Sequence, residues 1–155
     1  MKIGIRLFLV GLVALAICET GRAQSAAARV EKQLFTAVNQ ARREQGLPAL
    51  RWDESLAAAA RRHAEVMASH GSAQHGFEGE PSLAVRVRQA GAHVSWLSEN
   101  VTQGPTGEFI HSQFMSSPNH RANILDRDMD SVGIGAVERG GQLFAVEDFA
   151  QARER

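Results

Sequence analysis

The chain has 155 residues, of which 17 are basic, 17 are acidic, six are histidine and one, Cys18, is cysteine. This length is typical of one domain, and the balanced charge provides no cationic face for nucleic acid. A single cysteine excludes an intramolecular disulfide, so the fold must depend on its hydrophobic core.

The first 23 residues have the pattern of a secretory signal peptide. Lys2 and Arg6 precede an apolar run over 7–17, which is too short to span a bilayer permanently. Small residues occupy the usual offsets, so we expect cleavage after Ala23 and no integral membrane span. Residues 1–23 contain three basic residues and one acidic residue, so the remaining 132 residues have a formal net charge of −2.

Cys18 leaves a second interpretation of this segment open. Residues 15–18, Leu-Ala-Ile-Cys, resemble the lipid-attachment box of a lipoprotein. Ile17 argues against that box, because a small residue is expected there, so the cut after Ala23 is favoured. Both interpretations predict an exported protein, and the sequence does not distinguish the periplasm from the extracellular space.

Two helices are predicted next. Residues 24–30 are small and polar and are expected to form a short tether ahead of a single domain over 31–151. The pattern then becomes helical until Gly46, with apolar residues at helical spacing: Val30, Leu34, Val38 and Ala41. Asp53 is placed to cap a second helix that extends to about Ser69. Its expected buried stripe is Leu56, Ala60, His63, Ala64 and Met67, with His63 interpreted as a core histidine bonded to a backbone carbonyl.

The middle third is less regular. A loop over 71–79 carries His75, a short helix is expected over 81–90, and a strand over 96–103 contains Glu99. A further helix is expected over 106–115, with Phe109, Ile110 and Phe114 facing inward.

The segment 116–125, Ser-Ser-Pro-Asn-His-Arg-Ala-Asn-Ile-Leu, predicts a short helix. Ser117 is a suitable cap, and Pro118 fits the first helical position, where its missing N–H costs nothing. The first turn then carries His120 and Arg121, and we expect Ile124 and Leu125 to face inward.

Two closing strands, 132–137 and 143–146, flank Gly140-Gly141 and predict a β-hairpin. Helices in the first two thirds of the chain and an antiparallel hairpin at its end indicate an α+β domain, not alternating βαβ units.

The chain resembles the bacterial branch of the CAP superfamily, also called SCP domains, which includes cysteine-rich secretory, antigen 5 and pathogenesis-related proteins. The resemblance covers about Leu34 to Phe149 and depends on five motifs in order: the helix over 60–68, His75, Ser98-Glu99-Asn100-Val101, the segment 117–125 and Val132-Gly133-Ile134-Gly135. It implies an α-β-α sandwich with a central antiparallel sheet and an open cleft. In some members this cleft binds a divalent metal, often zinc, through two histidines and one or two acidic residues.

Carried onto this sequence, the resemblance implies that His75, Glu99 and His120 form the metal site. Two imidazoles, one carboxylate and an open fourth position suit Zn²⁺, although copper or nickel would bind such ligands more tightly. Glu99 could also orient a metal-bound water instead of ligating. The matching position of a second family glutamate is Ser117, so Glu99 is expected to be the only acid of the site. The residues expected to support the cleft are Asn100, Arg121, Asn123 and Ser117.

Two classes of function follow from these residues. The favoured one is a secreted binding module whose cleft holds a metal, small ligand, lipid, glycan or peptide without turnover. The alternative is a metal-dependent hydrolase of peptides or cell-envelope polymers, with Glu99 as general base. The sequence contains no Gly-x-Ser-x-Gly elbow and no His-Glu-x-x-His helix, and it leaves both enzymatic activity and oligomeric state open.

Overall fold

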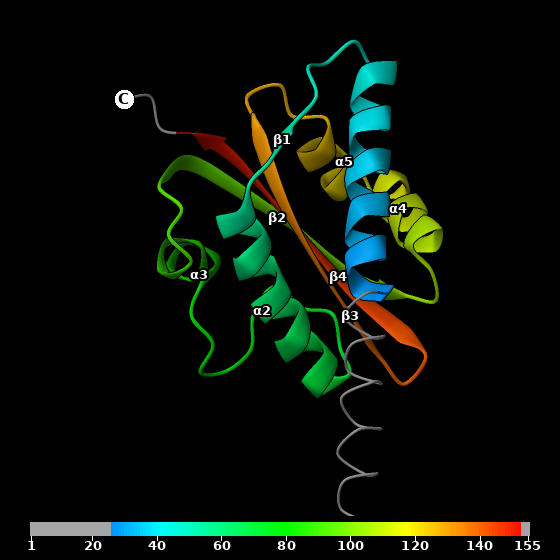
Figure 1. Ribbon diagram of the computed structural model, residues 1–155, viewed down its shortest axis with the longest axis vertical. Helices are drawn as coiled ribbons and strands as arrows, with labels where there is room; N and C mark the ends of the chain where they lie inside the picture. The colour runs from blue at the N-terminus through cyan, green and yellow to red at the C-terminus, as the bar shows by residue number, and fades with distance from the viewer. Residues whose placement is uncertain (1–25, 153–155) are drawn as a thin grey trace, which may run out of the picture.

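The computed structural model describes residues 26–152, so the predicted signal peptide and Cys18 lie outside the described residues. An N-terminal helix occupies residues 26–44 of this part (Figure 1). The elements that follow are β1 (Arg51–Trp52), α2 (Glu54–His70), α3 (Leu83–Gln89), β2 (Val94–Gly104), α4 (Gly107–Ser116), α5 (Pro118–Ile124), β3 (Ser131–Arg139) and β4 (Gln142–Ala152). None of the helices within residues 26–152 is long and apolar enough to cross a membrane.

The four strands form one sheet in the order β1-β3-β4-β2. Strand β4 pairs antiparallel with both β3 and β2, whereas β1 is a two-residue strand that pairs parallel with β3. Strand β2 therefore lies at an edge. Its register places Glu99 opposite Asp148 and Asn100 opposite Glu147. Because successive side chains alternate between faces, these two pairs lie on opposite faces of the sheet.

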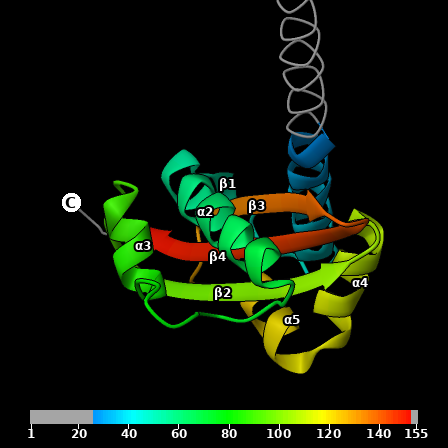
Figure 2. The same cartoon turned by 90° about the horizontal axis from the view of Figure 1, so that it is seen from below.

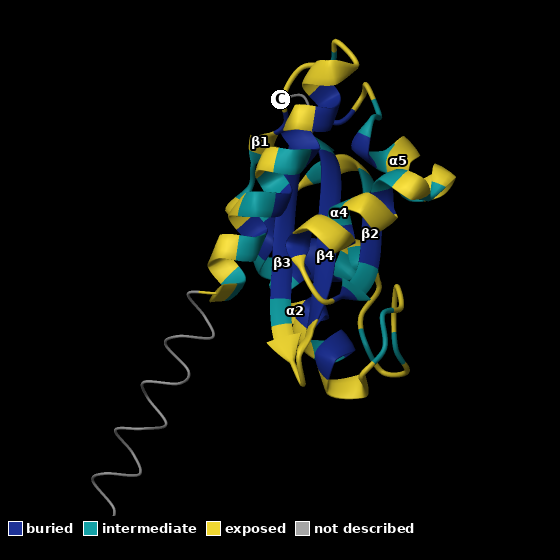
Figure 3. Ribbon diagram, turned by 90° about the vertical axis from the view of Figure 1, so that its right-hand side faces the viewer, coloured by how far each residue is buried: buried dark blue, intermediate teal, exposed yellow. Residues whose placement is uncertain are grey.

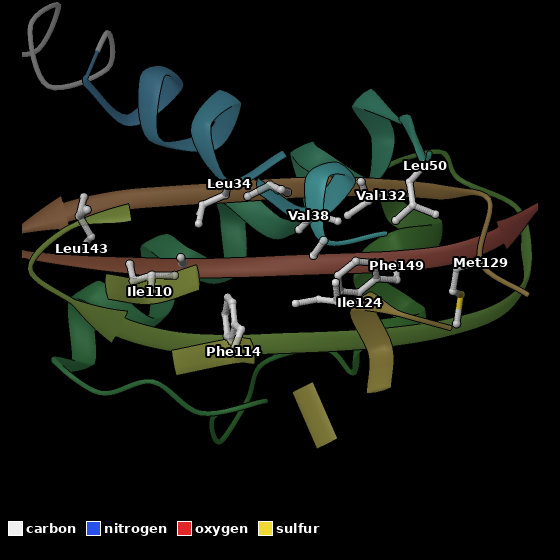
Figure 4. Packing of buried hydrophobic residues seen from close by; sticks show 13 residues of the cluster. Leu34, Val38, Leu50, Ile110, Phe114, Ile124, Met129, Val132, Leu143 and Phe149 are labelled. Atoms are coloured by element: carbon white, nitrogen blue, oxygen red, sulfur yellow. The ribbon is translucent and has the colours of Figure 1, made fainter. Parts of the chain in front are cut away.

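Helices cover both faces of the sheet, which confirms the predicted α+β sandwich. Figures 1 and 2 show α2 and α3 on one side and the N-terminal helix, α4 and α5 on the other. The larger core cluster lies beneath the second group (Figure 4); its largest fully buried members are Phe114, Phe149, Leu34, Ile110, Ile124 and Ile134. Strand β4 is buried along most of its length (Figure 3), as expected of a strand covered on both faces.

Helix α2 follows its sequence signals closely. The Asp53 carboxylate accepts the Leu56 N–H, and Gly71 ends the helix in the left-handed region. Gly133 and Gly135 allow α2 to lie directly on β3, because a Cβ at Gly133 would come within 2.0 Å of the Ala57 nitrogen. The predicted buried stripe of α2 is confirmed, including His63, which is completely buried.

Three local expectations were wrong. The N-terminal helix already includes residues 26–30, predicted as a tether, because their three alanines favour helix. Phe109, expected to face inward, is 42 % exposed, because α4 packs on the core through Ile110 and Phe114. Ser117 occupies the N-cap position of α5, but its side chain makes no capping hydrogen bond.

Candidate functional site

His75 and Glu99, 24 residues apart in sequence, are in direct contact. His75 lies in the loop between α2 and α3, and its Nδ1 is 2.9 Å from Oε1 of Glu99 on β2. A carboxylate only accepts, so Nδ1 donates and Nε2 is left without its proton in the neutral ring. The His75 side chain is 63 % exposed, whereas that of Glu99 is 3 % exposed. The hydrogen bond to Glu99 raises the pKa of His75 above its usual value.

The second carboxylate oxygen of Glu99 is also occupied. Arg86, on α3, donates from Nη2 to Oε2, and both side chains are buried. Nε2 of His63 is 3.9 Å from the same oxygen. Glu99 is therefore a buried, ion-paired carboxylate that orients His75 from behind.

Two further acids lie close to Glu99 beneath the site. Asp148 lies directly across the ladder from Glu99 and is completely buried, and Glu80 lies 3.7 Å from Nη1 of Arg86. Burial, reinforced by the charge of Glu99, holds the pKa of Asp148 well above its usual range. This raised pKa favours the protonated form of Asp148, and the Arg86 charge balances Glu99.

His120 lies in the first turn of α5, and its ring packs edge-on against Phe114 at 5.2 Å between ring centroids. Burial lowers the pKa of His120, and the positive charge of His75 lowers it further. His120 is consequently neutral at pH 7 and able to act as a ligand. The two imidazoles approach the β2 edge from opposite faces of the sheet, His75 beside Glu99 and His120 above Asn100.

An amide network holds the backbone of His120. Asn100 donates from Nδ2 to the His120 carbonyl and to Oε2 of Glu147, each over 3.1 Å. Asn123 donates to Oδ1 of Asn100 over 2.9 Å. Glu147 is completely buried, and burial raises its pKa to about 8. Arg121 is exposed on α5, where its guanidinium has no hydrogen-bond or ion-pair partner among residues 26–152.

The predicted zinc ligands His75, Glu99 and His120 do not form a preorganised three-ligand group. Within residues 26–152, no three histidine, cysteine, aspartate or glutamate side chains are arranged to hold a metal ion. The carboxylate of Glu99 is engaged by His75 and Arg86. Glu99 lies in the orienting position behind His75, as a carboxylate does behind a ligating imidazole.

Sequence reasoning missed Arg86, Glu80, Asp148 and Glu147. The last two carried a usable signal, since they interrupt the apolar run of the second hairpin strand and occupy both of its faces. Two adjacent acids inside a strand that is otherwise apolar on both faces indicate buried carboxyl groups.

Comparisons with known proteins agree with this architecture. The YkwD protein of Bacillus subtilis (strain 168) is 30% identical over 122 residues, which are 78% of this chain and 48% of YkwD. This chain therefore spans about half the length of that relative. An extracellular protein of Bacillus anthracis that contains an SCP domain has a TM-score of 0.79 and 21% identity, covering 84% of this chain and 43% of that one.

An outer surface protein of Borrelia burgdorferi has a TM-score of 0.74 and 17% identity, covering 81% of this chain and 94% of that one. At these identities the two structures show a shared fold. The model of the cysteine-rich secretory protein family, CAP, matches residues 35–149, most of the described chain. The chain belongs to the CAP, or cysteine-rich secretory protein, family.

Proposed function

We propose that this chain is an exported binding module in which His75 and His120 hold a divalent metal ion. The observation that carries the proposal is the hydrogen bond from His75 Nδ1 to the buried Glu99, which leaves Nε2 available on an exposed ring. A carboxylate behind a ligating histidine fixes the tautomer and the direction of the ring, as in many metal sites.

The two imidazoles are prepared for metal binding in different ways. His120 is kept neutral by burial, and His75 is oriented by Glu99. Imidazole suits Zn²⁺, Cu²⁺ and Ni²⁺, and a bound ion would act as a Lewis acid with further positions open to oxygen ligands. With two protein ligands, the remaining positions of the ion would be completed by water or by the polar group of a lipid, glycan or peptide.

Binding without turnover is favoured over metal-dependent hydrolysis by the surroundings of Glu99. A general base must reach the proton it removes, directly or through one water. Glu99 is 3 % exposed, and its two oxygens face His75 and Arg86. It is therefore better suited to hold an imidazole than to accept a proton from a substrate water.

Export is supported by the signal-peptide pattern of residues 1–23 and by the extracellular and outer-surface descriptions of the two similar structures. The choice between periplasm and extracellular space does not affect the proposed site.

Calorimetric titration of Zn²⁺ into the purified protein, carried out without a metal-binding tag, tests the proposal. One equivalent should bind, and His75→Ala and His120→Ala should each weaken binding at least about tenfold. His93→Ala is the control, because His93 is exposed in the α3–β2 connection. Absence of binding to the parent protein, or equal binding to all variants, would overturn the proposal.

A further inference from the structure

The loop that carries His75 is held from beneath by a histidine outside the proposed metal site. His63 is completely buried on α2. Its Nε2 lies 2.8 Å from the carbonyl oxygen of Gln74, and its Nδ1 lies 2.6 Å from Oε1 of Glu80. Because a carbonyl only accepts, Nε2 carries a proton, and one further proton joins Nδ1 to the Glu80 carboxyl.

These two contacts lie on either side of His75 in sequence. Gln74 immediately precedes His75, and Glu80 ends the turn that follows it. Glu80 also accepts the Phe77 N–H at Oε2 over 3.3 Å, so the ring of His63 and the backbone of the turn share one carboxyl group. Figure 2 shows this loop passing along β2 between the ends of α2 and α3.

The loop has no helix or strand of its own between Gly71 and Ser82. Arg86 adds longer bonds, from Nη1 to the carbonyl oxygens of His75 over 3.4 Å and Pro81 over 3.2 Å. The shorter contacts are those of His63. The tertiary contacts of the loop therefore determine where the ring of His75 lies relative to Glu99.

We infer that His63 is a positioning residue for His75: it holds Gln74 and Glu80, and thereby keeps Nδ1 of His75 on Glu99 and Nε2 directed outward. This inference rests on the proposed function where it concerns the metal. A buried imidazole is a demanding choice for this place in the core, because both of its nitrogens need partners, whereas a leucine would fill similar space with none.

Two substitutions separate positioning from simple filling of the core. His63→Gln retains an N–H that can reach the Gln74 carbonyl, whereas His63→Leu retains the bulk and no donor. Zn²⁺ affinity should fall roughly 10–100-fold in the leucine variant, as for other residues that orient a ligand, and should recover to within about threefold in the glutamine variant. Met67→Leu, a buried change on the same helix, is the control, and urea unfolding of each variant confirms folding.

A second measurement does not require metal. Long-range ¹H–¹⁵N correlation of the histidine rings reports which nitrogen of His75 carries the proton. At a pH above the raised pKa of His75, where the ring is neutral, the wild type should show one tautomer, with the proton on Nδ1, and His63→Leu should show a mixture. If the wild type binds no Zn²⁺ but His63→Leu loses the single tautomer, the proposed function fails and the positioning role stands.

An unchanged tautomer together with Zn²⁺ affinity within about twofold of wild type in His63→Leu would overturn the inference. Equal loss of affinity in the glutamine and leucine variants would also overturn it, because the retained donor would then have no effect. Should His63→Leu not fold, Glu80→Ala removes the partner of Nδ1 from the loop side and leaves α2 intact. The same loss of affinity and of the single tautomer is expected there, and wild-type behaviour of Glu80→Ala would overturn the inference.

Discussion

The two faces of the sheet hold their histidines by different chemistry. On the α2 face, His75 is held through its side chain by a buried ionic group of Glu99, Arg86 and Glu80. On the α5 face, His120 is held through its backbone by Asn100, with Asn123 and Glu147 behind it. The α2 face, which we call the ionic face, determines the protonation and direction of the His75 ring. The α5 face, which we call the amide face, determines the position of helix α5.

The difference begins with two adjacent residues of the edge strand. Glu99 and Asn100 point to opposite faces because side chains alternate along β2, and each meets an acid of β4 directly across the ladder. Arg86 balances the charge on the first face. Among the described residues, the second face has no cation in its hydrogen-bond network, and burial keeps Glu147 protonated instead. The adjacent residues Glu99 and Asn100 thus support two different polar environments, one on each face of the sheet.

The largest expected effect comes from breaking the ionic face. Arg86→Met should destabilise the protein by about 3–5 kcal/mol, because it leaves Glu99 buried without its cation. Urea unfolding measures the loss. Arg86→Met combined with Glu99→Leu should recover much of it, since replacing a buried pair by apolar side chains is often neutral. If Arg86→Met lowers the free energy of unfolding no more than Asn100→Ala does, the contrast between the two faces is wrong.

A smaller loss is expected on the amide face. Asn100→Ala removes the donor to His120 and Glu147 and the acceptor for Asn123, at a cost of about 2–3 kcal/mol in unfolding free energy. Ser116→Ala, which removes an exposed hydroxyl bonded within α4, should cost less than about 0.5 kcal/mol in the same assay. Comparable losses in the two variants would show that the amide network adds nothing specific.

The smallest effect, counted per pH unit, is a slope of the unfolding free energy with pH. The pKa of Glu147 rises from 4.5 to about 8 in the folded state because the group is buried. The stabilisation linked to this proton is complete below pH 4.5 and is lost as pH rises to about 8, at about 1.4 kcal/mol per unit. Glu147→Gln should remove this slope and leave that of Asp148. Unfolding free energies at pH 5, 6, 7 and 8 test this, and parallel curves for the two proteins would contradict it.

Local chemistry explains which elements were predictable. The Asp53 cap, the Gly71 stop and the Gly140-Gly141 turn act through neighbouring backbone groups, so their signals lie within a few residues. The β2 and β4 strands were predicted too short, because pairing with β4 extends β2 beyond its local apolar pattern. Phe109 was misplaced because a helix of ten residues can turn either flank of its apolar stripe inward.

By itself, the sequence determined the class of domain, the order of its elements and the family. It also identified His75, Glu99 and His120 as residues of interest, since their motifs are local. Only the tertiary structure decided that Glu99 contacts His75 and Arg86, that Asp148 and Glu147 lie behind the two faces, and that His63 holds the loop. These are contacts between residues distant in the chain, and strand register and helix packing set them, not the chemistry of neighbouring residues.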